Sequence, residues 1–235
     1  MLMLTTKNNP KNVERFIKHY QKTEAKLPVF LLCNHDDASL DGLKIPDHFH
    51  LCKLEVEDPS VNKINDAFIK QFPCAPWYGF LTDKAIPRTK HWDRLILKAL
   101  KRYPFVHCKD HYTDNEHCNI FFIRGDLMRA HGDYLPCPLR HYYLDCYWYW
   151  MTTWLGIRAY IENVTIEYSQ EDRHLKHTQE WADRAKIELD IYVDYLNSKK
   201  WHASWYRIQS ALSLKASIPP NIDIDKATAS PVAHS

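Results

Sequence analysis

The stretch WYGFLTDKAIPRTKHWDRLILKAL, residues 77–100, decides the fold of this chain. Its apolar start, residues 78–81, predicts a short buried strand, and residues 92–99 carry apolar side chains at the i, i+3, i+4, i+7 spacing of a helix. Asp83 therefore follows the carboxyl end of the strand. Open α/β sheets bind ligands outside those ends, because the loops vary while the sheet stays rigid. Two interpretations stay open: Asp83 holds a metal ion there, or it only caps a turn.

Composition and charge describe a globular protein without a charged stripe. The 235 residues suffice for one good-sized domain with a helical appendage, and an apolar content of 45% can supply its core. The net charge of +2 comes from 31 basic and 29 acidic residues that are mixed along the chain. This pattern gives no support for binding to nucleic acid or to a membrane surface.

The start of the chain and the cysteines indicate a cytoplasmic protein. Residues 1–9 have no basic segment followed by a long apolar one, and nowhere do about 18 apolar residues follow one another, so we expect no membrane span. The 7 cysteines form no C-x-x-C pair, as expected of reduced thiols. With 5 glycines and neither a G-x-G-x-x-G nor a G-x-x-x-x-G-K motif, we expect no glycine-rich phosphate loop.

Strands and helices alternate along most of the chain. We expect strands at residues 2–6, 29–33, 49–54, 78–81, 105–109, 120–123 and 158–168, and helices at residues 10–24, 59–72, 92–99, 126–132 and 141–156. This alternation predicts an α/β fold built on a mostly parallel sheet. We assign residues 1–170 to this domain.

The C-terminal part predicts a helical extension. Two amphipathic stretches, 178–197 and 201–212, form a helical hairpin within residues 171–216. The apolar stripe of the second helix consists of Trp201, Trp205, Ile208 and Leu212. It either packs on its neighbour or makes a homodimer through the C-terminal helices, because exposed aromatic side chains in a row form an interaction surface. The composition of residues 217–235 predicts a disordered tail.

Acidic loops follow three of the predicted strands. They contain Asp36 and Asp37, Asp83, and Asp110. Because the carboxyl ends of parallel strands meet at one edge, these loops are expected to gather there. Mg²⁺ and Mn²⁺ prefer oxygen ligands and bind through one or two carboxylates plus phosphate oxygens. The pattern favours a nucleotide site, although strand-end aspartates also occur simply because loops are polar.

Two helical patterns have both a functional and a structural interpretation. His141, Asp145 and Trp148 share one helix face at i, i+4, i+7 spacing, which suits an active-site wall or a structural His–Asp contact. Asn65 lies on the apolar face of its helix, either as a satisfied core amide or as a ligand contact.

Zinc binding and nucleophilic hydrolysis find little support in the sequence. Residues 107–118 contain three histidines and two cysteines, but their spacing fits no standard structural zinc pattern, so a non-metal interpretation is favoured. There is no G-x-S-x-G elbow, and the cysteines lie in apolar contexts, which argues against a hydrolase.

Five blocks of sequence, taken in order, resemble those of nucleotide-sugar glycosyltransferases with the GT-A fold, family-two-like and including small phage-type members. The blocks are TTKNNPKNVERFI (5–17), VFLLCNHDD (29–37), VNKINDAF (61–68), WYGFLTDKAIPRTKHWD (77–93) and GDYLPCPLRHYYLDCYW (132–148). The match covers about residues 2–168. It implies a GT-A (Rossmann-like) fold: a central mixed, mostly parallel sheet flanked by helices, here with the C-terminal helical extension.

The resemblance also implies an activity and a donor site. A hexosyltransferase would move a sugar from a nucleoside-diphosphate sugar, expected to be a UDP-sugar, to an acceptor hydroxyl. The residues that match the nucleotide-contacting positions of the family are Thr5, Thr6, Lys7, Asn8, Arg15, Asn34, Asp36, Asp37, Lys63 and Asn65.

The metal-binding element of the family maps onto residues 82–84. Asp83 would hold Mn²⁺ or Mg²⁺, but Lys84 stands where a second acid is common. Either one carboxylate suffices, or Lys84 pairs directly with phosphate. The later histidine of the family has no clear counterpart, although His174 or His177 could serve.

The catalytic position of the family maps onto Asp145, with His141 one turn before it. A carboxylate within about 3 Å of an acceptor hydroxyl is a suitable general base. Alternatives remain: a GT-A-like protein that binds without catalysis, or a transferase that acts on modified bases of phage DNA. The acceptor is a glycan, a protein or modified DNA.

Overall fold

A computed structural model of the chain describes residues 1–111, 115, 117–136, 138–139, 142–169 and 179–215. The elements, in chain order, are β1 (Leu2–Thr5), α1 (Pro10–Lys22), β2 (Val29–Asn34), β3 (Phe49–Leu54), α2 (Val61–Gln71), β4 (Trp77–Thr82), β5 (Ala85–Pro87), α3 (Trp92–Leu100), β6 (Phe105–Lys109), β7 (Phe121–Arg124), α4 (Gly125–His131), α5 (Leu144–Trp154), β8 (Arg158–Tyr168), α6 (Gln179–Leu196) and α7 (Lys199–Ala211). The expected tail at 217–235 and the candidate residues His141, His174 and His177 lie outside the described residues.

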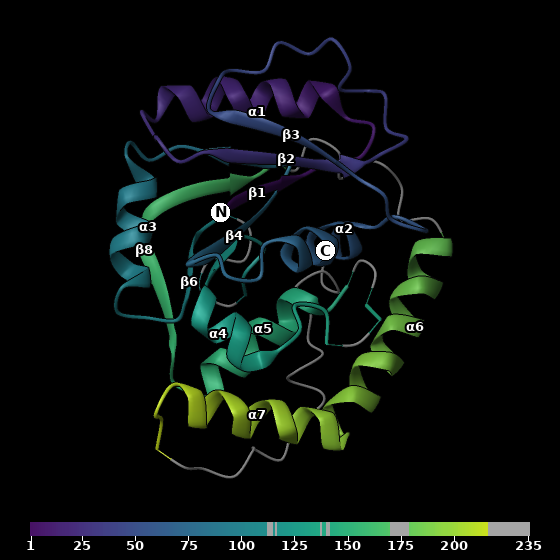
Figure 1. The fold of residues 1–235 in the computed structure, drawn as a ribbon, viewed down its shortest axis with the longest axis vertical. Helices are drawn as coiled ribbons and strands as arrows, with labels where there is room; N and C mark the ends of the chain where they lie inside the picture. The colour runs from purple at the N-terminus through teal and green to yellow at the C-terminus, as the bar shows by residue number, and fades with distance from the viewer. Residues whose placement is uncertain (112–114, 116, 137, 140–141, 170–178, 216–235) are drawn as a thin grey trace.

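The strands form one curled mixed sheet in the order β3-β2-β1-β4-β7-β6-β8-β5. Strands β1 to β4 run parallel to one another, β7 runs antiparallel to β4 and β6, and β8 runs parallel to β6. The carboxyl ends of β1, β2, β3, β4, β6 and β8 therefore lie along one side, which we call the C-terminal edge. The predicted α/β class with a mixed, mostly parallel sheet flanked by helices is confirmed (Figure 1).

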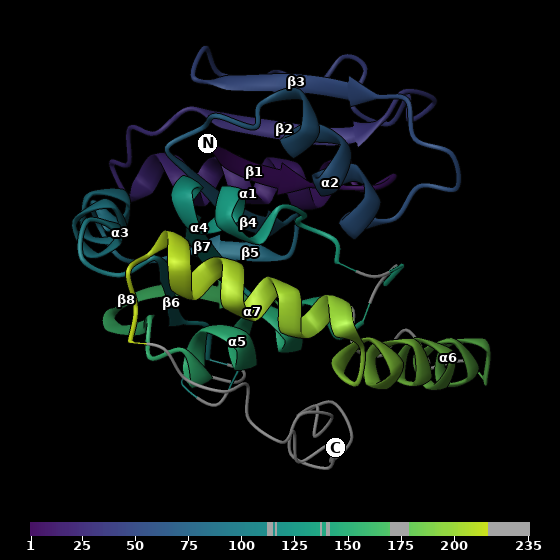
Figure 2. The same ribbon diagram turned by 60° about the horizontal axis from the view of Figure 1, so that its bottom comes forward.

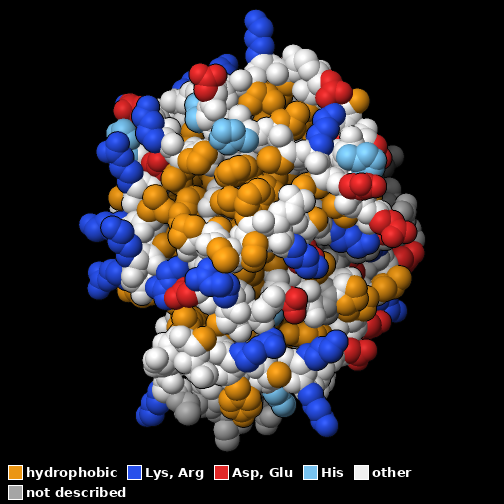
Figure 3. Space-filling view, in the orientation of Figure 1, with side chains coloured by type: hydrophobic (Ala, Val, Ile, Leu, Met, Phe, Trp, Pro, Cys, Tyr) orange, Lys and Arg blue, Asp and Glu red, His pale blue; other side chains and the backbone are white. Residues whose placement is uncertain are grey.

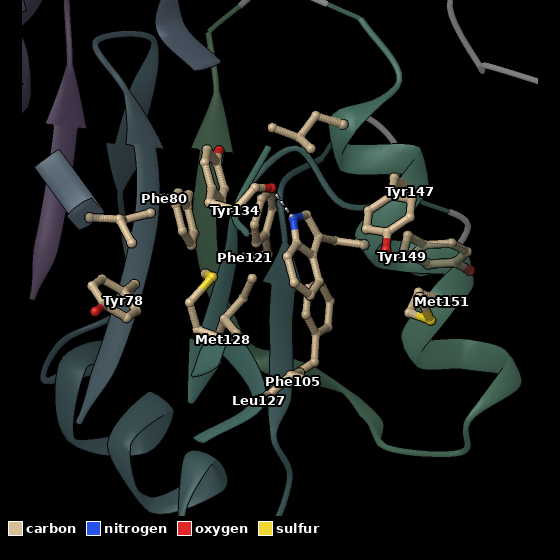
Figure 4. Packing of buried hydrophobic residues seen from close by; sticks show 14 of the residues in the cluster. Tyr78, Phe80, Phe105, Phe121, Leu127, Met128, Tyr134, Tyr147, Tyr149 and Met151 are labelled. Atoms are coloured by element: carbon tan, nitrogen blue, oxygen red, sulfur yellow. Dashed lines mark hydrogen bonds between the residues drawn. The ribbon is translucent and has the colours of Figure 1, made fainter. Parts of the chain in front are cut away.

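Two apolar cores lie on the two faces of the sheet. Helices α1 and α3 cover one face, where Phe16 and Trp92 are fully buried. Helices α2, α4, α5 and α7 cover the other face, which is rich in aromatic side chains. Figure 4 shows part of this second core. The Phe80 ring stacks with Phe121 and with Tyr134, with ring centroids 4.7 Å and 4.6 Å apart. This stack holds the segment before α5 against the sheet.

Three local expectations need correction. The short strand β5 follows Asp83 and was not predicted, because its partner β8 lies far along the chain. Helix α2 does not begin at Pro59: the Ser60 side chain caps it by accepting a hydrogen bond from the Lys63 N–H at 3.4 Å. Helix α5 begins only at Leu144, since the preceding Tyr143 has a left-handed φ of 62°.

The C-terminal helices lie at one side of the molecule, and α6 extends outward from the N-terminal end of α7 (Figure 2). The aromatic stripe of α7 is covered by its own chain: Trp201 and Trp205 are buried, and the Trp201 ring packs edge-on against Tyr147 at 5.8 Å. The Arg207 guanidinium donates to the His131 carbonyl oxygen at 2.6 Å and fixes α7 on α4. Trp201, Trp205 and Ile208 therefore belong to the core of this chain. A homodimer through the C-terminal helices stays a prediction.

The described surface carries no continuous stripe of one charge on the face seen in Figure 3, where acidic and basic side chains surround an apolar centre. None of the helices within the described residues is long and apolar enough to cross a membrane. The six cysteines within the described residues form no disulfide.

Gly125, the first residue of α4, is required by close backbone packing. A Cβ atom there would lie 1.9 Å from the Ala75 carbonyl oxygen, a backbone atom that cannot rotate away. We therefore expect Gly125→Ala to lower the free energy of unfolding by about 2–4 kcal/mol, measured by urea denaturation. Gly42→Ala is the control, because nothing lies within 4 Å of its Cβ and only its φ of +87° costs about 1 kcal/mol. Equal losses in the two variants would contradict the steric explanation.

Candidate functional site

The acidic loops gather at the C-terminal edge, where the β1–α1 loop bridges two of them. The Thr6 hydroxyl donates to Asp83 Oδ2 at 2.8 Å, and the Asp83 N–H donates to the Thr5 carbonyl oxygen at 3.2 Å. Asn8 follows Thr6 by two residues on the same loop, and its N–H donates to Asp37 Oδ2 at 2.9 Å. Asp83 and Asp37 therefore lie at the same end of the sheet and are held by one loop.

The second strand contributes a set of polar groups that fix its own loop. The Asn34 amide donates to Asp36 Oδ1 at 2.7 Å, and its oxygen accepts from the Val56 N–H at 3.0 Å. Asp37 is buried, and its other oxygen accepts from the Ser39 N–H at 2.9 Å. Burial raises the pKa of Asp37, but the hydrogen bonds from Asn8 and Ser39 outweigh it and hold this pKa below its usual value. Asp37 is therefore an ionised anchor for two loops.

Asn65 links β1, α2 and the segment before α5. It is buried and accepts from the Thr5 hydroxyl at 2.5 Å. Its side chain also hydrogen-bonds Tyr134, whose pKa is raised by burial and only partly lowered by that bond. These contacts are those of a satisfied core amide.

The basic candidates are spread around the edge. Lys84 Nζ lies 6.0 Å from the centroid of the Tyr168 ring, within the range of a cation–π contact. Lys63 reaches Asp58 at 3.5 Å and the Glu57 carbonyl oxygen at 3.4 Å, in the segment before α2.

The remaining two basic candidates lie on the loop after β1 and on the helix that follows it. Lys7 is exposed, and Arg15 on α1 is half-buried.

Asp145 lies in the first turn of α5, and its partner is His117, which lies outside this helix. Asp145 Oδ2 lies 3.0 Å from His117 Nε2, and its other oxygen accepts from the Cys146 N–H at 2.9 Å. The side chain of Asp145 is 34% exposed, whereas His117 is buried. The expected partner, His141, lies outside the described residues.

The Asp145–His117 pair is an ion pair at neutral pH. Burial alone raises the pKa of Asp145, but the charge and hydrogen bond of His117 lower it below the usual value. Burial lowers the pKa of His117, yet Asp145 and Cys146 raise it well above 6.5. The Cys146 thiol stays protonated, because burial raises its pKa to about 11. The carboxylate is thus ionised and held in one orientation.

The loop that carries His117 is clamped by polar contacts. Asn115 accepts from the Arg158 guanidinium at 3.0 Å and, through its carbonyl oxygen, from the Tyr149 hydroxyl at 2.8 Å. At the other end, the Asn119 amide donates to Asp110 Oδ2 at 2.8 Å. Sequence spacing could not have paired His117 with Asp145, because an irregular loop brings them together. The only signal was the number of histidines and cysteines at 107–118.

The ion pair makes stability depend on pH. Because the folded pKa of His117 is raised, its stabilisation is present below the usual value of 6.5 and is lost as pH rises through the folded pKa. Because the folded pKa of Asp145 is lowered, its stabilisation is present above the usual 3.8 and is lost as pH falls through the folded pKa. The pair therefore stabilises between about 3.8 and the raised pKa of His117.

We expect His117→Gln to lower the free energy of unfolding by about 1–3 kcal/mol near neutral pH, less than for a fully buried pair because solvent screens Asp145. The difference in the free energy of unfolding between the variant and the wild type should shrink as pH rises through the raised pKa of His117. Urea denaturation at several pH values measures it. His202→Gln, on the exposed side of α7, is the control. A difference that stays constant with pH would exclude the ion pair as its cause.

The expected divalent cation fits Asp83 as a single protein ligand. Asp83 is 9% exposed and lies at the C-terminal edge. Within the described residues, one group of three side chains could hold a metal ion, and it consists of His117, Asp145 and Cys146. Asp83 is not part of this group. Mg²⁺ and Mn²⁺ commonly use one carboxylate plus substrate phosphates, which is compatible with this arrangement.

The comparisons with known proteins bear on the fold. No protein-family model matches the chain, and no curated protein sequence does. Among solved structures, the chain is similar to the mannosyltransferase PcManGT from Pyrobaculum calidifontis in complex with GDP-Man and Mn²⁺. The TM-score is 0.62 at 11% identity, and the match covers 90% of this chain and 73% of that one. At this identity the likeness shows the fold alone, and the expected GT-A (Rossmann-like) fold is confirmed.

Proposed function

We propose that the protein is a glycosyltransferase that moves a sugar from a nucleoside-diphosphate sugar to an acceptor hydroxyl. The observation that carries the proposal is a buried carboxylate, Asp83, at the C-terminal edge of a GT-A fold, where it accepts a hydrogen bond from Thr6. Thr6 lies on the loop that the resemblance assigns to the nucleotide. Asp145 supplies a second carboxylate, which is oriented by His117. Unlike Asp83, this side chain is partly exposed, and it lies at the start of a helix. We further propose that the enzyme is family-two-like.

Asp83 is the residue that would hold Mn²⁺ or Mg²⁺ on the donor. Such an ion neutralises the negative charge that grows on the departing diphosphate. Thr6 fixes one Asp83 oxygen by its hydrogen bond at 2.8 Å and so orients the carboxylate. Lys84, next in the chain, could instead pair with phosphate directly.

Asp145 is the proposed general base. As the acceptor oxygen attacks the anomeric carbon, its proton must leave, and an ionised carboxylate in hydrogen-bond reach can take it. The Cys146 N–H and His117 hold both oxygens, so the carboxylate is oriented before an acceptor arrives. The acceptor hydroxyl would approach from the exposed side of Asp145.

A GT-A-like protein that binds a nucleotide, glycan or protein without catalysis is the second candidate. Two observations favour it. His117 lowers the pKa of Asp145, which makes the carboxylate a weaker base. Only one acid marks the metal position.

The test is donor binding followed by turnover. Thermal shift with UDP-sugars and GDP-mannose, with and without Mn²⁺, identifies the donor. Release of nucleoside diphosphate is then measured with free glycans, peptides or hydroxymethylated DNA as acceptors. Release that requires an acceptor supports the transferase, and its absence in the presence of donor binding supports the non-catalytic candidate. Absence of any nucleotide effect would exclude the transferase and leave only a non-catalytic protein that binds a glycan or another protein.

A further inference from the structure

Three side chains of different ligand classes meet at the start of α5. His117 Nε2 lies 3.0 Å from Asp145 Oδ2 and 3.8 Å from Cys146 Sγ. One ligand atom from each residue lies within 4.8 Å of the others. An imidazole, a carboxylate and a thiol are thus placed around one point by two segments that are distant in the sequence.

These separations are close to those of a tetrahedral zinc site. With Zn–N and Zn–O of about 2.0–2.2 Å and Zn–S of about 2.3 Å, tetrahedral ligands lie about 3.4 Å apart for N and O, and about 3.6 Å apart for N and S. The observed 3.0 and 3.8 Å differ from these by a few tenths of an ångström. The third separation, between the Asp145 oxygen and Cys146 Sγ, is within 4.8 Å.

The surroundings also suit a divalent ion. His117 and Cys146 are buried, while the Asp145 side chain is 34% exposed, so an ion and a water in the fourth position can reach the cluster from that side. Asp145 Oδ1 is held by the Cys146 N–H, which leaves Oδ2 for the metal. Carboxylate and thiolate together balance a charge of two, and the displaced thiol and imidazolium protons go to solvent.

We propose that His117, Asp145 and Cys146 bind Zn²⁺ at a site separate from the cation expected at Asp83. Thiolate and imidazole select zinc, whereas Mg²⁺ and Mn²⁺ favour all-oxygen ligands. The consequence rests on the proposed function: zinc on Asp145 Oδ2 occupies the general base, so zinc inhibits transfer at a step that Mn²⁺ on the donor does not affect.

Cobalt as a spectroscopic substitute tests the site without reference to activity. Adding Co²⁺ to the whole protein should produce a thiolate-to-cobalt charge-transfer band in the near ultraviolet, saturating at one ion per chain and removed by Zn²⁺. Cys146→Ser should abolish this band, while Cys74→Ser, which changes an exposed thiol, should retain it. No band, or a band unchanged in Cys146→Ser, overturns the proposal.

His117→Gln gives a second measurement in case Cys146→Ser does not fold. The variant should bind Co²⁺ roughly 100-fold more weakly or worse, since even groups outside the ligand shell contribute 10–100-fold to affinity. Circular dichroism of each variant reports folding. Unchanged Co²⁺ affinity in folded His117→Gln overturns the proposal.

Nucleotide release separates this inference from the proposed function. In wild type and Cys74→Ser, Zn²⁺ should inhibit release at concentrations that fill the cobalt site, with excess Mn²⁺ present. A cobalt site in a protein without transferase activity would refute the proposed function and keep the zinc site. Transferase activity without a cobalt site would support the proposed function and refute the zinc site.

Discussion

Asp145→Asn is expected to lower the rate of sugar transfer by about 10²–10⁴-fold, the usual contribution of a positioned general base. The amide keeps the size of the carboxylate and can still accept from the Cys146 N–H, but it cannot take a proton from the acceptor. The measurement is kcat for nucleoside-diphosphate release with a saturating donor and acceptor. Donor affinity should stay within about twofold, because Asp145 is assigned to the acceptor and not to the nucleotide.

Asp126→Asn is the matched control for this prediction. Asp126 also lies in the first turn of a helix, α4, and its carboxylate accepts from the Leu127 N–H at 2.8 Å. Both variants therefore remove one negative charge beside a helix N-terminus. If Asp126→Asn slows transfer as much as Asp145→Asn, the effect is one of helix stability and Asp145 is not the base.

Asp83→Asn is expected to abolish the effect of Mn²⁺ on donor affinity and to lower kcat/KM by about 10²–10³-fold. The estimate corresponds to the loss of one oriented group that stabilises charge in the transition state. Isothermal titration with the nucleoside diphosphate, with and without Mn²⁺, measures the binding part. Asp41→Asn serves as the control, since Asp41 is exposed and pairs with Lys53 at 2.7 Å.

The same experiment decides whether the diphosphate charge is balanced by a metal ion on Asp83 or by the side chain of Lys84. Lys84→Met should change donor affinity little if a metal ion carries the phosphate charge. If Asp83→Asn retains activity and Lys84→Met loses it, then Lys84 pairs with the diphosphate directly and the enzyme does not require a metal.

Hydrophobic periodicity was enough to predict most elements. The expected strands at 49–54, 105–109 and 158–168 coincide with β3, β6 and β8, because each is a short apolar or alternating run bounded by turn residues. Helix α5 differs: its aromatic run predicts a start at 141, but Tyr143 takes a left-handed φ and the helix begins at Leu144. Periodicity shows which residues can be helical and not where a loop turns.

Only part of the candidate site could be predicted from the sequence. Parallel strands must end on the same side, so the loops with Asp37 and Asp83 could be placed together from the sequence. Their bridge through Thr6 and Asn8 could not, because it depends on the conformation of the β1–α1 loop. The pairing of Asp145 with His117 was likewise hidden, since no period relates an irregular loop to a helix.

The sequence by itself determined the alternation of strands and helices and the acidic loops at strand ends, because each depends on local composition and spacing. The tertiary structure alone decided which side chains touch: Thr6 with Asp83, and His117 with Asp145 and Cys146. Each of these contacts joins segments that are far apart in the sequence, so it depends on loop closure and on the packing of the whole fold.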